Sequence, residues 1–242
     1  MNVMNFDLST EQSMLQKMIR EFSDEVVAPG AIERDKNKTF PVEVFKQLSD
    51  MGIMGLPFPE EYGGAGADTI SFAIVTEELS RTCASTGITY SAHISLGGAP
   101  LHLFGTEKQK EKYLTPICTG ESFGAFGLTE PNAGSDAGGT ETTASLENGE
   151  FVINGSKVFI TNASYAKHLA LTAITGRNGD NKEISAIIVP TDAQGFTIKS
   201  EYEKMGLNAS NTTELILENV HVPEENLLGV KGNGFKQFLK TL

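Results

Sequence analysis

The stretch ASLENGEFVINGSKVFI, residues 144–160, contains two Asn-Gly pairs, at 148–149 and 154–155, each between runs of β-favouring residues. Asn-Gly is the preferred dipeptide of tight two-residue hairpin turns, so the stretch predicts two successive hairpins. Four further β-favouring runs follow, separated by turn residues, at 169–175, 184–189, 196–200 and 213–220. Short turn spacing without intervening helices is typical of an antiparallel sandwich or barrel.

Before residue 120 the apolar residues recur with helical spacing instead. Ser9 and Thr106 each begin a capping-box pattern, with Gln three residues later, and so predict two helix starts. Pro41 suits the first position of a helix that Gly52 ends, and residues 90–104 are apolar enough for a buried helix. The chain is helical again from residue 233 onward.

The chain therefore divides into three parts of an α+β multidomain protein. We expect an all-α domain over residues 1–121 and an antiparallel β-barrel or sandwich domain over residues 122–231. Residues 232–242 are then the start of a further helical domain, inside which the chain ends.

Composition and charge exclude several classes of protein. Of the 242 residues 39% are hydrophobic and 21% charged, which is ordinary for a globular chain and excludes wholesale disorder. The net charge of −12 argues against nucleic acid binding through phosphate neutralisation. No apolar run approaches the length of a membrane span, and the first seven residues lack the features of a signal peptide. We expect a cytoplasmic protein whose two cysteines are reduced.

The segment FGLTEPNAGSDAGG, residues 126–139, runs from a predicted strand into a turn rich in Gly, Ser, Asn and Asp. Such a loop can direct several backbone N–H groups toward one point and so bind an anion, with Thr129 and Ser135 adding hydroxyl groups. The alternative is a plain surface turn, which composition alone favours.

Phe159 and Thr161 lie two residues apart in a predicted strand and therefore share one face of it. Phe159 can stack on a flat ring while Thr161 hydrogen-bonds a heteroatom of that ring. Taken alone, the simpler interpretation is that Phe159 belongs to the core and Thr161 to a turn at the strand end.

Together these segments resemble the acyl-CoA dehydrogenase flavoproteins, and the resemblance extends along the whole chain. The most specific motif is LTEP at 128–131 followed by GSD at 134–136. The other matching motifs are PEEYGG at 59–64, EELSR at 77–81, GTEKQK at 105–110, NGSK at 154–157, ITN at 160–162, VPEEN at 222–226 and GNGFK at 232–236. The spacing is most similar to that of short-chain, butyryl-type or bacterial fatty-acyl members. Two departures are Phe159, where the family often has Trp, and Asn208, where it usually has Arg.

The resemblance implies an FAD site. Thr129 would hydrogen-bond the polar edge of the isoalloxazine ring, and Ser135 would contact both the flavin pyrophosphate and the pantetheine arm of the substrate. Phe159 would cover the flavin face away from the substrate, and Thr161 would point at flavin N5. The implied cofactor-binding residues are Phe126, Gly127, Leu128, Thr129, Gly134, Ser135, Phe159, Ile160 and Thr161, and Ser135 is also implied to bind substrate.

The family's reaction is α,β-dehydrogenation of an acyl-CoA thioester in fatty-acid or branched-chain amino-acid catabolism. A carboxylate removes an α-proton, hydride leaves to flavin N5, and the electrons pass to an electron-transfer flavoprotein. The resemblance gives Glu130 a structural part. It places the base in a C-terminal four-helix bundle that also forms most of a tetramer interface. Because the chain stops as that domain begins, we expect these residues to contain no catalytic base and to be inactive alone.

Two other functions stay open: a non-catalytic flavin- or acyl-CoA-binding protein, and an acyl-CoA oxidase that passes electrons to O₂. The four histidines show no metal-ligand spacing, so no metal is expected. His93 either lines the acyl chamber or, more simply, is a buried imidazole hydrogen-bonded to a neighbour.

Overall fold

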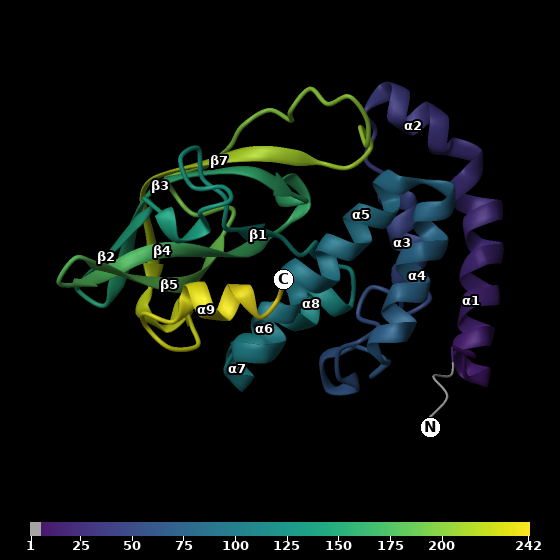
Figure 1. Ribbon diagram of the computed structural model, residues 1–242, viewed down its shortest axis with the longest axis horizontal. Helices are drawn as coiled ribbons and strands as arrows, with labels where there is room; N and C mark the ends of the chain where they lie inside the picture. The colour runs from purple at the N-terminus through teal and green to yellow at the C-terminus, as the bar shows by residue number, and fades with distance from the viewer. Residues whose placement is uncertain (1–5) are drawn as a thin grey trace.

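The computed structural model describes residues 6–242 (Figure 1). Helices occupy the chain up to residue 118, and strands dominate it from residue 126 to residue 228. This order confirms the predicted fold class, in which a helical part precedes a mostly antiparallel β part. Residues 1–5, which belong to the signal-peptide argument, lie outside the described residues. Within residues 6–242, no helix has both the length and the apolar character needed to cross a bilayer.

The helical part consists of α-helices that short π-helical segments connect. Both predicted capping boxes form, since the hydroxyls of Ser9 and Thr106 accept the N–H of the Gln three residues later. Pro41 is the N-cap of its helix and not, as predicted, its first residue. The helices are α1 (Thr10–Phe22), α2 (Ala31–Asn37), α3 (Val42–Asp50), α4 (Thr69–Thr82), α5 (Ala84–Ala92), α6 (Ala99–Phe104), α7 (Glu107–Gln109), α8 (Thr115–Cys118) and α9 (Gly234–Leu239), with π-helical segments η1 (Ser23–Val27), η4 (His93–Gly98) and η5 (Lys110–Leu114).

A buried carboxylate joins α1 to α4. The Glu78 side chain is 1% exposed and accepts hydrogen bonds from Arg20 at 2.7 and 2.9 Å and from Arg81 at 3.2 Å. Two guanidinium groups therefore compensate the charge of one buried carboxylate, as burial of an ion requires.

The β part is one sheet of eight strands. The order is β6-β7-β3-β2-β4-β5-β8, and β1 pairs with β4. Most pairings are antiparallel, as predicted, and two depart from this pattern, because β1 and one residue of β2 lie parallel to β4. The β2–β3 hairpin lies between β1 and β4 in sequence and gives the chain the length to return in the same direction. The strands are β1 (Phe126–Gly127), β2 (Thr143–Glu147), β3 (Glu150–Thr161), β4 (His168–Asn178), β5 (Asn181–Pro190), β6 (Phe196–Ile198), β7 (Thr212–Pro223) and β8 (Leu227–Leu228).

Of the two predicted hairpins, only the first exists. Asn148 and Gly149 both have positive φ, 51° and 84°, and form the turn between β2 and β3. The second prediction is wrong, because β3 runs without a turn through residues 154–155. Gly155 instead lies at a register shift between β3 and β7 and has φ of 151°. A β-carbon there would lie 2.5 Å from the Thr142 hydroxyl. Only glycine therefore fits at this irregularity in the strand.

The sheet is buried on both faces at β4 and β5. Ala170 and Ile188 belong to the core that the helices share, together with Phe126 and Leu128. Their neighbours on the other face, such as Leu171, belong to a second core inside the β part. The two parts are therefore packed through β1, β4 and β5, and Figure 1 shows α9 beside this face.

The connection between β6 and β7, residues 199–211, crosses from the sheet to α2 (Figure 1). Glu203 pairs with Lys38 at 2.5 Å, and the Asn208 amide donates to the Asp35 carboxylate at 2.7 Å. The Asn208 side chain also contacts Asp35, at 3.4 Å. Asn208, one of the two positions at which the sequence differs from the family that it resembles, therefore lies in a contact between the loop and α2.

The helical part and the segment that leads into the sheet approach each other closely at Gly97 in η4. A β-carbon on Gly97 would lie 2.1 Å from the Cα of Gly124, and one on Gly124 would lie 2.5 Å from the His93 carbonyl oxygen. Neither backbone can move aside without separating η4 from the segment that leads into β1.

We expect Gly97→Ala to destabilise the fold by about 1–3 kcal/mol or more, because the added methyl meets backbone atoms that cannot rotate away. Thermal unfolding of the purified variant measures this loss. Gly206→Ala is the matched control, since no atom lies within 4 Å of its added β-carbon. An unchanged melting temperature for Gly97→Ala would contradict the close packing.

Candidate functional site

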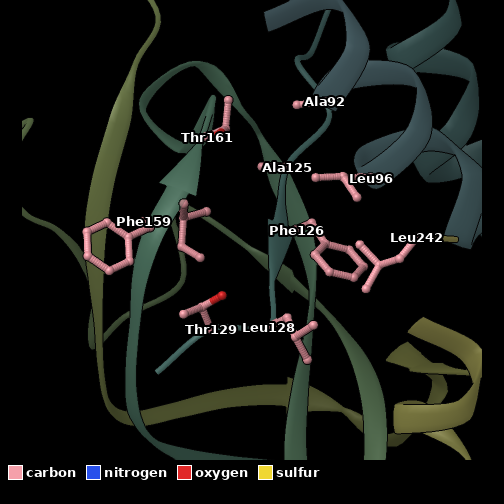
Figure 2. Close-up of a pocket in the computed structure, with 10 residues that line it drawn as sticks. Ala92, Leu96, Ala125, Phe126, Leu128, Thr129, Phe159, Thr161 and Leu242 are labelled. Atoms are coloured by element: carbon pink, nitrogen blue, oxygen red, sulfur yellow. The ribbon is translucent and has the colours of Figure 1, made fainter. Parts of the chain in front are cut away.

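A pocket lies where α5 and η4 meet β1 and β3 (Figure 2). Its volume is about 140 Å³. It brings together six of the nine residues predicted to bind cofactor, from two segments about thirty positions apart in the sequence. The lining residues are Ala92, Leu96, Ala125, Phe126, Leu128, Thr129, Phe159, Ile160, Thr161 and Leu242.

Phe159 has the backbone and the exposure expected of a functional residue. Its side chain is 65% exposed, and its φ of 58° is in the left-handed region, which is uncommon for a bulky residue. The cause is a register shift between β3 and β7 that spans Lys157 and Ile160. Lys157 and Ile160 are buried, whereas Phe159 and Thr161 stay accessible. The sequence prediction that Phe159 and Thr161 share an accessible face fits this arrangement, and the alternative of a core Phe159 does not.

Two hydroxyl groups of the pocket have no protein partner. In the described part of the chain, neither the Thr129 nor the Thr161 side chain makes a hydrogen bond, although the Thr129 carbonyl accepts one from Val158 N–H at 2.9 Å. Both hydroxyls can therefore donate to, or accept from, a polar group of a ligand. The only ring contact of Phe159 among the described residues is with Tyr202, at 5.1 Å between centroids.

The remaining three predicted residues do not line the pocket. Gly127 allows close packing of strands, because a β-carbon there would lie 2.7 Å from the Leu171 side chain. Gly134 and Ser135 are exposed on the loop at residues 131–139. The Ser135 hydroxyl makes no hydrogen bond to the described residues, so it is open to a ligand.

A buried ion pair lies directly behind the pocket wall. The Lys157 ammonium is 0% exposed and donates to the Glu130 carboxylate at 2.6 Å, to Thr172 Oγ1 at 3.0 Å and to the Leu128 carbonyl at 3.3 Å. Burial alone raises the pKa of Glu130, but the charge of Lys157 and the hydrogen bonds to the carboxylate outweigh it, so this pKa lies below its usual value. Glu130 is thus ionised, and both of its carboxylate oxygens already accept hydrogen bonds. It does not suit the role of a general base.

No Asp, Glu or His side chain lines the pocket within residues 6–242. The described residues also contain no cluster of three or more His, Cys, Asp or Glu side chains that could hold a metal ion.

His93 is a buried link between the helices and the strand. Its Nδ1 accepts the N–H of Gly124 and its Nε2 donates to the Met54 carbonyl, each at 3.0 Å. Burial lowers the pKa of His93 to about 4, because an imidazolium would be poorly solvated and would turn a second N–H toward Gly124. His93 does not line the pocket. Its neighbours Ala92 and Leu96 do, and sequence reasoning missed them because small and apolar helix residues carry no distinctive signal.

Residues 9–121 match the family described as acyl-CoA dehydrogenase, N-terminal domain, and residues 125–220 match acyl-CoA dehydrogenase, middle domain. The chain belongs to the acyl-CoA dehydrogenase family. One relative is the probable acyl-CoA dehydrogenase YngJ of Bacillus subtilis, 55% identical over 99% of this chain and 63% of the relative.

Solved members of the acyl-CoA dehydrogenase family have the same fold. Butyryl-CoA dehydrogenase from Megasphaera elsdenii superposes with a TM-score of 0.92 and 40% identity, over 98% of this chain and 63% of that one. A chain of the structure described as the electron transferring flavoprotein of Acidaminococcus fermentans gives a TM-score of 0.94 and 44% identity, with the same coverage. The chain thus spans a little under two thirds of the length of these relatives.

The buried histidines predict how stability changes with pH. Burial lowers the pKa of both His93 and His168 from 6.5 to about 4, so between these values the unfolded state binds more protons than the native state. The free energy of unfolding should therefore fall as the pH is lowered from about 6.5 to about 4. His93→Gln should remove part of this dependence, roughly 3 kcal/mol over the window.

Denaturant unfolding at several pH values measures this dependence, with exposed His221→Gln as the control that keeps it. A slope of stability against pH that His93→Gln leaves unchanged would contradict the role of the buried imidazole.

Proposed function

We propose that this chain forms the flavin- and acyl-binding parts of an FAD-dependent acyl-CoA dehydrogenase. The observation that carries the proposal is the pocket in which the exposed Phe159, held at positive φ, lies with the unpartnered hydroxyls of Thr129 and Thr161. A flat aromatic ligand with polar edges satisfies all three groups at once.

The residues fit FAD on this chemistry. Phe159 offers a ring face for stacking, and the two threonines offer hydrogen bonds to ring heteroatoms. The exposed loop at residues 131–139 offers the Ser135 hydroxyl and backbone N–H groups to a phosphate or a pantetheine arm. A related acyl-CoA dehydrogenase from Bacillus anthracis was solved as a complex with FAD, which supports the assignment. Bound FAD supplies a hydride acceptor at N5.

The chain's own residues orient and enclose an acyl group. Ala92, Leu96 and Phe126 give the pocket an apolar wall that excludes water from the acyl chain. The butyryl-CoA dehydrogenase relative favours a short acyl-CoA as substrate. Dehydrogenation also needs a carboxylate at the α-proton, and we propose that it comes from outside residues 6–242.

Further parts of the proposal concern the assembled protein. An electron-transfer flavoprotein is the proposed electron acceptor, supported by the match to a chain of the Acidaminococcus fermentans structure. We propose a homotetramer in the cytoplasm, and domains over residues 1–121 and 122–231, with residues 232–242 starting a third.

The test is a titration of the purified protein with FAD, followed by flavin fluorescence, and then anaerobic addition of butyryl-CoA with a visible absorption spectrum. We expect FAD to bind and butyryl-CoA to change the flavin absorption. No binding of FAD would overturn the proposal. Binding without any response to acyl-CoA would favour a non-catalytic flavin-binding protein, and oxygen uptake on substrate addition would favour an oxidase.

Because no Asp or Glu side chain lines the pocket within residues 6–242, the 242-residue chain with added FAD should not reduce an artificial electron acceptor when butyryl-CoA is supplied. Butyryl-CoA dehydrogenase from Megasphaera elsdenii serves as the positive control. Turnover at a comparable rate would place the base within this chain and contradict the proposal on that point.

Phe159→Leu and Thr161→Val should each weaken FAD binding by about two- to tenfold, because one removes ring stacking and the other a hydrogen bond. Thr197→Val, an exposed threonine of β6 outside the pocket, is the matched control. FAD dissociation constants from fluorescence titration measure the effect. If the unaltered chain and the three variants bound FAD with equal affinity, Phe159 and Thr161 would have only a structural role.

A further inference from the structure

The pocket has two walls that come from segments far apart in sequence. Leu128 and Thr129 follow β1, whereas Phe159 and Thr161 belong to β3. The spacing of the walls determines how a flat ring fits between Thr129 and the aromatic side chain, so whatever joins the two segments controls that fit.

Three hydrogen bonds join the segments at this level. Val158 N–H donates to the Thr129 carbonyl at 2.9 Å. The Lys157 ammonium donates to the Leu128 carbonyl at 3.3 Å and to the Glu130 carboxylate at 2.6 Å. The residues on either side of Thr129 are thus both held by the side chain of Lys157, two positions before Phe159.

Further hydrogen bonds hold both side chains of the Glu130–Lys157 ion pair in place. Thr172 on β4 accepts the third bond of the ammonium at 3.0 Å. The Glu130 carboxylate accepts the N–H of Glu141 at 2.6 Å and that of Thr142 at 3.2 Å, so it also ties both ends of the loop at residues 131–139. Neither side chain has the freedom to change rotamer without breaking charge-assisted hydrogen bonds.

Lys182 secures the far end of the same loop. Its ammonium donates to the carbonyls of Gly139 at 3.0 Å and Thr140 at 2.8 Å. One buried cation and one partly buried cation therefore hold the two ends of the loop, and its exposed part, which carries Ser135, projects from them. Ordering both ends reduces the entropy that the loop loses when a ligand binds.

We propose that Glu130 and Lys157 are positioning residues for the flavin, because their ion pair sets the distance between the two pocket walls and fixes the two ends of the loop that carries Ser135. This inference rests on the proposed function, since it assigns the pair a role in binding the same cofactor. Neither residue lines the pocket.

Stability and cofactor binding can be separated with three variants. Lys157→Met leaves the buried Glu130 without its counter-ion and should lower the melting temperature by about 10 °C. Glu130→Gln leaves the buried ammonium without its counter-ion in the same way. The double variant Lys157→Met with Glu130→Gln carries no buried charge at this site, and Gln still offers an acceptor to the two loop N–H groups. We expect its melting temperature to return most of the way to that of the unaltered chain.

The affinity of the double variant for FAD should not recover as its melting temperature does. We expect the double variant to bind FAD about tenfold or more weakly, because two of the three hydrogen bonds between the walls are lost even though no buried charge is left unpaired there. The visible circular dichroism of the bound flavin should also change, since it reports the surroundings of the ring. Glu78→Gln is the matched control, because it removes a buried carboxylate from an ion pair between α1 and α4. It should lower the melting temperature and leave FAD affinity and the flavin spectrum unchanged.

Two results would overturn the inference: a double variant whose FAD affinity recovers together with its stability, or one whose affinity and flavin spectrum equal those of the unaltered chain. Either would make the pair purely structural. A failure of the proposed function looks different, because the unaltered chain would then bind no FAD.

Discussion

A lysine ammonium with no exposed surface must find several partners inside the protein, and Lys157 meets this requirement with groups from two other segments. Leu128 and Glu130 follow β1, Thr172 lies on β4 and Lys157 itself on β3. Each segment reaches the ammonium only if the strands have their observed register. The ion pair therefore links correct sheet assembly to the position of one pocket wall. An apolar residue in place of Lys157 would pack equally well in a sheet, but it would not specify which carbonyl and which carboxylate meet at this point.

A second constraint places the helices against that wall. Gly97 and Gly124 let two backbones approach to a distance that no side chain permits, and His93 bridges the same junction with its two ring nitrogens. Gly124 lies two residues before β1, so the helical part and the sheet meet at the start of the strand that continues into the pocket. The apolar wall contributed by Ala92 and Leu96 is held by this junction, whereas the polar wall is held by the ion pair. The two halves of the pocket are thus positioned by independent interactions.

Local chemistry in the sequence predicted the features that depend on neighbours along the chain. Both capping boxes and the turn at residues 148–149 need only residues within a few positions, and all three form as predicted. The turn predicted at residues 154–155 failed because β7 provides a partner for an unbroken β3, and no local pattern contains that partner. For the site, the motif residues of the strands do line one pocket, while Gly134 and Ser135 lie outside it on an exposed loop. The role of Lys157 depends on a contact across 27 positions, and the sequence marks it only as part of a motif.

The same arrangement explains why Glu130, although it lies close to the pocket, does not suit the role of a base. Proton abstraction from carbon requires a carboxylate that is accessible to the substrate and whose pKa is raised toward neutrality. Glu130 has the opposite properties, because its oxygens accept bonds from Lys157 and two loop N–H groups, and its pKa is lowered. If Glu130 were freed to act on a substrate, the ammonium behind the wall would lose its counter-ion and the wall would lose its anchor. A carboxylate that positions this pocket cannot also abstract a proton in it, so binding and proton transfer must be assigned to different residues.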